Sequence, residues 1–484
     1  MDREQYVCCD EPALRASFRS NSADPRASRR FRKAGYEAID RVCEYMETME
    51  QGKVDVIAPV APGYLAPLIA DSVPVAGEDW STISGDFDKV IMPGITHWQH
   101  PSFFAYFRLD VSFQHEGGVG GGIIMGSASE SCLTAVIAAR ERALRILPTA
   151  TFENLVIYGT TQTHSVGAKA ALILGLEFRA IETKEDDLWG LRGSTLKAAL
   201  DEDIAKGKVP FALLVTLGST STGAIDNIAE VTAVAADYPA LFIHCDAAWA
   251  GVYLACPELR EGCQLDAINA RSNAIGTSAA ICASGEVHSF CTNLHKSGLV
   301  TFDASCLWIR DRTLLTEALD VTPPFLRNKH SDSGAVVDFR NWQLALGRRF
   351  RSLKLMFVLR SHGVNGFQSH LRKLNSHAAH FSSLVLSSPN EFELFVPRRF
   401  SLVVFRLRGV SDADSDRLNR EFFARTSERK DIHLTPTIVG GKYCTRLAVG
   451  SPFTKVEHIE KAWELIQELA ADARRAVGEK EVVA

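Results

Sequence analysis

Hydrophobic positions in the middle of the chain follow an alternating rhythm of strand-like and helix-like segments. The apolar runs at residues 155–159 (LVIYG), 211–216 (FALLVT) and 242–246 (FIHCD) are short, as is typical of buried strands. Residues 164–176 (HSVGAKAALILGL) and about 226–236 carry helical patterns between them. This βα repetition predicts a mostly parallel, doubly wound sheet flanked by helices.

The hydrophobic pattern changes towards both ends of the chain. The first residues are polar and predict a flexible extension, and from Phe31 apolar residues recur at three- and four-residue steps, which predicts a helix. Short strand-like runs near the C-terminus, closed by an amphipathic helix at 455–473, predict a small α+β domain. The expected organisation is a flexible extension at 1–28, a helical arm with an aromatic segment at 29–110, a large domain at 111–365 and a small domain at 366–484.

Composition narrows the classes of partner. The chain has 484 residues, and its formal net charge of -5 leaves no basic excess to neutralise phosphates, so we expect no nucleic acid partner. No apolar run is long enough to span a bilayer, and the first residues lack the pattern of a signal peptide. The 11 cysteines show no C-x-x-C spacing, which favours reduced thiols over disulfides or a zinc site. We therefore expect a cytoplasmic protein without a membrane partner or a metal.

An acid and a lysine stand at the ends of two strand-like runs. Asp246 ends the run at 242–246, and Lys296, preceded by His295, ends the run at 290–296 (FCTNLHK). Open α/β sheets bind ligands at the carboxyl ends of their strands. A lysine and an acid at one such edge suit pyridoxal 5'-phosphate, which has an aldehyde to capture and a ring nitrogen to keep protonated. Taken singly, Asp246 could cap a helix and Lys296 could be solvated.

A glycine-rich stretch precedes a predicted helix. Residues 117–122 contain five glycines, and residues 127–130 (SASE) begin a helical pattern. Backbone N–H groups at a helix N-terminus after such a loop bind phosphate. No G-K-[ST] follows, so the stretch is not a P-loop, and the glycines alone could equally form a loose turn.

Two further segments could shape a ligand site. Residues 90–107 concentrate aromatic side chains, among them Trp98, Tyr106 and Phe107, which could form a wall for a flat apolar ligand or pack two domains together. Residues 322–339 are rich in Pro, Ser, Gly and charges between ordered segments, which predicts a mobile lid.

The order of these motifs resembles the pyridoxal-phosphate decarboxylases that act on aromatic amino acids, which have the aspartate-aminotransferase-like fold (type I). The motifs that carry the resemblance are IMPGITHW, FFAYF, GSASES, THSVGAKA, TLGSTSTG, HCDAAWAG, NLHK and LGRRFRSLK. They extend over nearly the whole chain. The resemblance implies a homodimer that converts an aromatic L-amino acid (Tyr, Phe, Trp or DOPA) into the aryl-alkyl amine and CO2.

The resemblance also assigns roles to individual residues. Lys296 corresponds to the lysine that binds the cofactor aldehyde, Asp246 to the partner of the ring nitrogen, and His164 to the imidazole stacked on the ring. The phosphate positions correspond to Ala128, Ser129, Asn293 and His295, the other ring neighbours to Thr216 and Ala248, and the substrate wall to Trp98, Tyr106 and Phe107.

One departure from the family pattern supports an alternative product. Phe325 stands where decarboxylases carry a lid Tyr, whose hydroxyl is thought to protonate the carbanion left by decarboxylation. Relatives with this Tyr-to-Phe change resemble aromatic aldehyde synthases, which release an aldehyde, CO2, ammonia and peroxide. Phe325 therefore divides the decarboxylase hypothesis from the aldehyde synthase hypothesis.

Other departures leave a third hypothesis, an inactive relative that only assembles or binds cofactor. The region at 108–125 is shorter than in the family, and Arg108 and Leu109 replace a usual Pro-Thr. Residues 270–284 resemble inserted sequence, and Ser297 stands where a Trp commonly follows the lysine. The sequence leaves the identity of the aromatic substrate and the pathway open.

Overall fold

The computed structural model describes residues 25–51, 53, 58–61, 64–70, 72–95, 120–270, 285–321 and 337–483. The chain forms two compact units, one of residues 1–61 with 80–109 and the other of residues 62–79 with 110–484. The domain boundaries expected from the sequence stay predictions. In the described part of the chain, no helix has both the length and the apolar character needed to cross a membrane.

The first unit contains a long helix, α2 (Pro25–Glu50), and a short one, α3 (Trp80–Asp86), which continues into η3 (Phe87–Ile91) and η4 (Met92–Gly94). The helix α2 begins at Pro25 rather than at Phe31. Polar contacts join α2 to α3 and η3: Trp80 Nε1 of α3 donates to Glu37 Oε2 at 2.9 Å, and Arg41 pairs with Asp88 of η3 at 3.0 Å.

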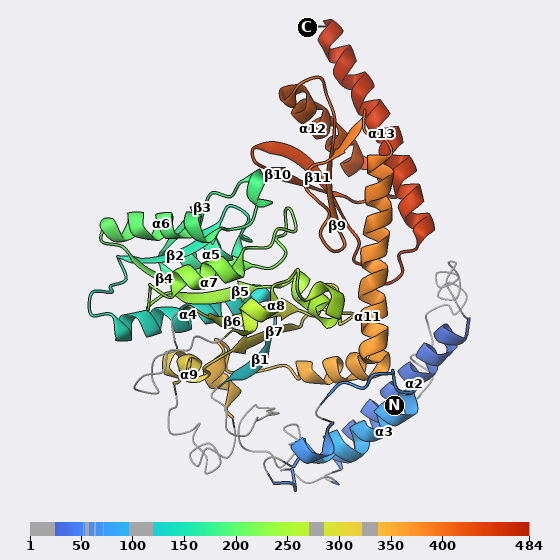
Figure 1. The fold of residues 1–484 in the computed structure, drawn as a ribbon. Coiled ribbons are helices and arrows are strands. Elements are labelled where there is room, and N and C mark those ends of the chain that lie inside the picture. Colours follow the sequence, from blue (N-terminus) through green and yellow to red (C-terminus); the bar gives the residue numbers. More distant parts are fainter. Residues whose placement is uncertain are drawn as a thin grey trace. The chain divides into compact units, whose positions relative to one another are not determined.

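The second unit contains a seven-stranded sheet (Figure 1). Its strands are β1 (Gly121–Met125), β2 (Leu155–Thr160), β3 (Glu177–Ile181), β4 (Val209–Thr216), β5 (Phe242–Asp246), β6 (Val287–Asn293) and β7 (Ser305–Ile309), in the order β1-β7-β6-β5-β4-β2-β3. Strands β3, β2, β4, β5 and β6 run parallel to one another. Strand β7 is antiparallel to both of its neighbours, β6 and β1. The predicted strands at 155–159, 211–216 and 242–246 and the mostly parallel sheet are confirmed.

Helices cover both faces of this sheet. On β4, Leu213 and Val215 belong to one apolar cluster, and Ala212 and Leu214 belong to another. Because alternate residues of a strand point to opposite faces, both faces are buried, which explains the continuous apolar runs. The helices of this part are α4 (Ala128–Ile146), α5 (Val166–Leu174), α6 (Gly193–Ala205), α7 (Ile228–Ala235), α8 (Leu265–Asn269) and α9 (Thr313–Leu319), with 3-10 turns η2 (Ala66–Leu68), η5 (Glu185–Asp187), η6 (Ala250–Ala255), η7 (Pro257–Leu259) and η9 (Phe339–Trp342).

The last two glycines of the glycine-rich stretch, Gly121 and Gly122, lie in strand β1 rather than in a loop, whereas Gly117 and Gly118 lie outside the described residues. A Cβ at Gly121 would lie 2.5 Å from the Trp342 ring, and one at Gly122 would lie 3.0 Å from the Trp308 ring. These glycines therefore serve close packing against two tryptophans. The predicted helix start after this stretch is confirmed at Ala128.

A second, smaller sheet forms near the C-terminus. Its strands β8 (Phe392–Leu394), β9 (Leu402–Leu407), β10 (Thr435–Val439) and β11 (Lys442–Ala448) pair antiparallel in the order β10-β11-β9-β8. Helices α12 (Asp412–Glu428), α13 (Val456–Val483) and the second half of α11 (Arg351–Leu386) share an apolar core with this sheet. The small α+β fold is confirmed, and α11, which begins at Arg351, kinks at Gly363.

Candidate active site

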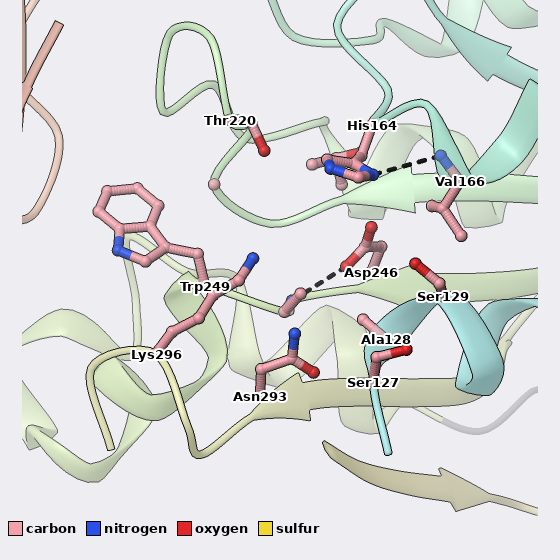
Figure 2. A pocket seen from close by; sticks show the side chains of 13 residues that line it. Ser127, Ala128, Ser129, His164, Val166, Thr220, Asp246, Trp249, Asn293 and Lys296 are labelled. Carbon is pink, nitrogen blue, oxygen red and sulfur yellow. Dashed lines mark hydrogen bonds between the residues drawn. The ribbon is translucent and has the colours of Figure 1, made fainter. Parts of the chain in front are cut away.

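A pocket opens beside the carboxyl ends of the central strands (Figure 2). It encloses about 590 Å³ of space free of protein atoms, including its open mouth. The residues that line it are Ser127, Ala128, Ser129, His164, Val166, Thr216, Gly218, Thr220, Asp246, Ala248, Trp249, Asn293 and Lys296.

Asp246 is the last residue of β5 and is 6% exposed. The Ala248 backbone N–H donates to its Oδ1 at 3.0 Å, and the Cys291 thiol lies 3.9 Å from the same oxygen. Within the described residues, Oδ2 has no hydrogen-bond partner. One carboxylate oxygen is thus fixed by the protein, and the other is free to accept a proton donor from a ligand in the pocket.

The buried thiols and the buried imidazole next to Asp246 are neutral at pH 7. Burial raises the pKa of the Cys245 and Cys291 thiols well above the usual value, and Asp246 raises them further. Burial lowers the pKa of His244 to about 4, against the opposing effect of Asp246. An ionised Asp246 would therefore not be neutralised by these side chains, which leaves its charge available to a cationic ligand group.

Lys296 lies in a tight turn that follows β6. Its backbone N–H donates to the Asn293 carbonyl at 3.1 Å, and a Cβ at Gly298 would lie 2.5 Å from the Leu294 carbonyl oxygen. The lysine side chain points into the same pocket as Asp246 (Figure 2). Lys296 keeps exposed surface in the open pocket. Desolvation by the surrounding protein nevertheless lowers the pKa of its amine, and this effect is larger than the opposing effects of Asp246 and Cys291, which raise the pKa. A lowered pKa favours the neutral, nucleophilic amine.

The other side of the pocket offers groups that suit a phosphate. Ala128 and Ser129 begin α4, whose first N–H groups have no acceptors within the helix. Ser127 caps this helix, because its Oγ accepts a hydrogen bond from the Glu130 backbone N–H at 3.3 Å. Asn293 ends β6 in the same pocket, and its side-chain amide N–H groups are donors that suit a phosphate oxygen. Backbone N–H groups and a positive helix end together form an anion site.

His164 and Thr216 complete the wall between these two regions. The Val166 backbone N–H donates to His164 Nδ1 at 3.2 Å, which fixes the ring at the start of α5. Thr216 lies beside Asp246 in the register of β4 and β5, and its buried Oγ1 has no partner among the described residues. The amine, the acid, the helix terminus, the Asn293 amide and the Thr216 hydroxyl fit a ligand that has an aldehyde, a ring nitrogen and a phosphate, as pyridoxal 5'-phosphate does.

Most of the predicted site residues come together here, with five exceptions. His295 does not line this pocket in the described structure, because its Nδ1 accepts a hydrogen bond from the Ala304 backbone N–H at 2.9 Å and its ring packs on Phe302. Its phosphate-binding role stays a prediction. Trp98, Tyr106, Phe107 and Phe325 lie outside the described residues.

Five lining residues were not predicted: Ser127, Val166, Gly218, Thr220 and Trp249. All of them lie within two residues of a predicted one or inside the quoted motifs TLGSTSTG and HCDAAWAG. The motifs could therefore have indicated them, but which neighbour of a site residue faces the pocket depends on the turn that follows each strand.

Comparisons with known proteins agree with this geometry. The sequence profile of the pyridoxal-dependent decarboxylase conserved domain matches residues 62–114 and 108–408. Tryptophan decarboxylase TDC2 of Camptotheca acuminata is 36% identical over 93% of this chain and 96% of the relative, and aromatic-L-amino-acid decarboxylase of Bos taurus is 36% identical over 93% and 98%. Phenylacetaldehyde synthase of Arabidopsis thaliana is 34% identical over 92% and 97%.

The fold agrees with solved structures as well. The structure of Oryza sativa TDC with PLP and tryptamine superposes with a TM-score of 0.68 at 31% identity, and the match covers 93% of this chain and 99% of the other. A profile match over most of the chain, relatives above 30% identity and a pocket that fits the cofactor lead to one assignment: the chain belongs to the pyridoxal-dependent decarboxylase family, and its cofactor is pyridoxal 5'-phosphate.

Proposed function

We propose that the protein decarboxylates an aromatic L-amino acid of the Tyr, Phe, Trp or DOPA class to the aryl-alkyl amine and CO2. The names of its relatives support this substrate class, since they include decarboxylases of tryptophan and of aromatic L-amino acids. The observation that carries the proposal is the presence of the Lys296 amine and the Asp246 carboxylate in one pocket beside the N-terminus of α4.

Each residue would do a distinct task in this reaction. When bound, pyridoxal 5'-phosphate supplies an aldehyde carbon and a protonated ring that accepts the electrons released as CO2 departs. Lys296 would hold the aldehyde carbon through its neutral amine, and Asp246 Oδ2 would keep the proton on the ring nitrogen. Ser129, Asn293 and the N-terminus of α4 would bind the phosphate.

His164 would cover one face of the ring. Because its Nδ1 accepts the Val166 N–H, the neutral imidazole carries its proton on Nε2. That N–H can donate to a substrate group in the pocket without any rearrangement of the helix start. Thr216 and Ala248 would contact the ring from the strand ends.

A second candidate is an aromatic aldehyde synthase, favoured by Phe325 in place of the lid Tyr. In this reaction one O2 and one water are consumed per amino acid, O2 is reduced to H2O2, and the products are an aldehyde, CO2 and ammonia. The similarity to a phenylacetaldehyde synthase supports this candidate as well. The third hypothesis, an inactive relative with a shortened 108–125 region, predicts cofactor binding without turnover.

One set of incubations separates the three functions. The protein with cofactor is given Tyr, Phe, Trp or DOPA, and CO2, amine, aldehyde and peroxide are measured. Amine with CO2 and no peroxide supports the decarboxylase. Peroxide and aldehyde support the synthase, and Phe325→Tyr should then move the product towards the amine. No product from any substrate supports the inactive relative.

The role of Lys296 is tested separately from turnover. Borohydride reduction followed by peptide mass analysis should locate the cofactor on Lys296, and Lys296→Ala should lose both this label and the visible absorption band. Lys169→Ala, which removes an exposed lysine on α5, is the matched control and should keep both. A label on another lysine would contradict the assignment.

We further propose a cytoplasmic homodimer. Helix α2 exposes an apolar face whose members are Phe31, Tyr36, Ile39, Val42 and Met46, between 47% and 82% exposed, and a second copy would bury this face. The described cysteines include no disulfide, and seven of the eight are buried free thiols, as is typical of a reducing compartment.

A further inference from the structure

A second buried carboxylate lies close to the pocket without lining it. Asp226 is 2% exposed, and in the described part of the chain it pairs with no lysine or arginine. Its two oxygens accept backbone N–H groups instead, Oδ2 from Thr216 at 2.7 Å and Oδ1 from Leu191 at 2.8 Å. Burial raises the pKa of Asp226 to about 6, although both hydrogen bonds lower it, so the carboxylate is mostly ionised at pH 7. Burying a charge without a cation is costly, so what these hydrogen bonds hold in place bears on the role of Asp226.

The hydrogen bonds of Asp226 hold the end of strand β4. The register of β2 with β4 ends at Leu213, three residues before the last residue of β4, Thr216. There Asp226 takes the place of a neighbouring strand, because its backbone N–H donates to the Thr216 carbonyl at 3.0 Å and its Oδ2 accepts the Thr216 N–H. The next N–H along the chain, that of Leu217, donates to the Asp246 carbonyl at 2.9 Å. The end of β4 is thus held between Asp226 and strand β5.

A fixed backbone at Thr216 also fixes the direction of its side chain. Threonine is β-branched and has few allowed χ1 rotamers, so the position of its hydroxyl follows that of its backbone. Thr216 is 4% exposed, lines the pocket and is the partner of Asp246 in the register of β4 and β5. Its Oγ1 has no hydrogen-bond partner among the described residues. The hydroxyl is therefore available to a ligand beside Asp246.

We propose that Asp226 is a positioning residue for cofactor binding, which acts through Thr216 by holding its backbone so that the hydroxyl faces the pocket. The inference rests on the proposed contact of Thr216 with the cofactor ring. A neutral side chain of the same shape cannot replace the carboxylate, because asparagine has one accepting oxygen and its NH2 group would face the second N–H. One buried backbone N–H would then lack an acceptor, and the end of β4 would lose a support.

The test measures cofactor binding by the full-length apoprotein, followed by the visible absorption band and by borohydride labelling of Lys296. The variants are Asp226→Asn, Thr216→Val, which replaces the hydroxyl by a methyl group, and the double variant. Each single variant should bind pyridoxal 5'-phosphate about three- to tenfold more weakly, as for one lost buried hydrogen bond. The double variant should bind little more weakly than either single variant, because both changes act on the same contact.

Asp203→Asn is the matched control, because Asp203 is another buried carboxylate, 5% exposed, whose partners are the Tyr158 hydroxyl at 2.7 Å and Arg179, and it does not line the pocket. It should lower the apoprotein Tm and leave cofactor binding unchanged, as a merely structural Asp226 would. All titrations are made well below the Tm of each variant. If Asp226→Asn does not fold, Gln264→Leu replaces it, because Gln264 Nε2 donates to the Asp226 carbonyl at 2.8 Å and its loss loosens Asp226 without removing the carboxylate.

The outcomes distinguish the inference from its premises. If the wild-type protein is not labelled at Lys296, the proposed function of the pocket is wrong, and the inference is wrong with it. If Thr216→Val binds cofactor as tightly as the wild type, the contact of Thr216 with the cofactor is wrong, and the inference fails for that reason.

If Thr216→Val binds more weakly, three results show that only the positioning role is wrong: wild-type affinity in Asp226→Asn, losses that add up in the double variant, or an equal loss in Asp203→Asn. Weaker binding in both single variants, without further loss in the double variant and with unchanged binding in Asp203→Asn, supports the positioning role.

Discussion

At the scale of single residues, the surroundings of Asp246 and Lys296 favour opposite chemical behaviour: the acid accepts a proton donor, and the amine loses its proton. The acid is held by a backbone N–H and a thiol that leave one oxygen free, and the buried thiols and imidazole beside it are neutral. The lysine amine is desolvated, which favours loss of its proton. A carboxylate that keeps a ring proton and an amine that gives its own away are the pair that this cofactor requires.

The lowered pKa of Lys296 predicts a pH-dependent stability of the apoprotein. In the unfolded chain the lysine keeps its ordinary, higher pKa, so between the two values the unfolded chain binds more protons and stability rises with pH. Below the folded value both states are protonated, and the full cost of burying the charge is present. Lys296→Met should therefore raise the apoprotein Tm at pH 7, and the gain should shrink as the pH approaches 10.

Thermal unfolding of the cofactor-free proteins at a series of pH values checks this prediction. Lys169→Met serves as control for the loss of an exposed lysine and should show no such trend. A gain in Tm from Lys296→Met that is independent of pH would point to improved packing rather than to a removed charge.

At the scale of elements, the N-terminus of α4 is the part of the site that needs no special side chain. Its contribution comes from the backbone N–H groups of the first helical turn. Ser127 fixes where this turn begins, because it is the N-cap residue. The same geometry makes the site sensitive to charge. An acid in the first turn of a helix is favourable for the helix itself but repels a bound anion.

Ser129→Asp exploits this conflict. We expect it to weaken binding of pyridoxal 5'-phosphate at least about tenfold, since like charges about 4 Å apart repel by on the order of 1–4 kcal/mol near a protein surface. Pyridoxal, which lacks the phosphate, should lose much less affinity, and the apoprotein Tm should not fall. Titrations of both ligands followed by absorbance provide the measurement, and equal losses for the two would argue against a phosphate at this helix end.

The kink in α11 is a second element with a local cause. Gly363 has φ of 60°, and a Cβ there would lie 2.5 Å from the Ala76 carbonyl carbon. The Val364 N–H donates to the Pro74 carbonyl at 2.9 Å, so the segment before α3 lies against the kink within the second unit. Only glycine accommodates both the left-handed backbone and the close approach.

Gly363→Ala should therefore lower the free energy of unfolding by about 1–3 kcal/mol or more through backbone strain and steric overlap. Gly366→Ala, one turn further along the same helix, is the matched control and should be near neutral or slightly stabilising. Chemical denaturation of both variants measures the difference. Equal stabilities would show that the chain before α3 simply moves away from the kink.

At the scale of the whole molecule, the exposed apolar face of α2 predicts self-association. The double variant Ile39→Asp with Val42→Asp places two charges on that face and should convert a dimer into monomers. Glu44→Gln changes a charge on another side of the same helix and should leave the dimer intact. Light scattering coupled to size exclusion gives the mass of each, and a monomeric wild-type protein would contradict the dimer proposal.

The sequence predicted the strands that carry the site better than the walls of the pocket. Asp246 and Lys296 were found because parallel strands gather their carboxyl ends at one edge, whatever the loops do. Trp249 and Thr220 depend on how two turns fold after their strands, which no periodicity records. Strand β1 was hidden because its glycines leave room for tryptophan rings that are distant in sequence.

The small domain shows the same limit. Its short runs were identified as strands, but such runs do not show which strands pair, and they pair antiparallel. The start of α11 at Arg351 also depends on tertiary contacts, since Arg348 packs over the Phe339 ring at 4.8 Å instead of continuing the helix.

The direction of the strands in the large sheet determines where the chain can accept additional residues without a change in the pocket. Residues 271–284 connect Ala270, at the end of α8, to Gly285, just ahead of the amino end of β6. The pocket lies at the opposite, carboxyl ends of these strands. Residues can be added before the amino end of β6 without shifting the positions of Asn293 and Lys296, because the pairing of β6 with β5 fixes the register of β6. A longer connection at this end of β6 is thus compatible with an unchanged pocket at the other end.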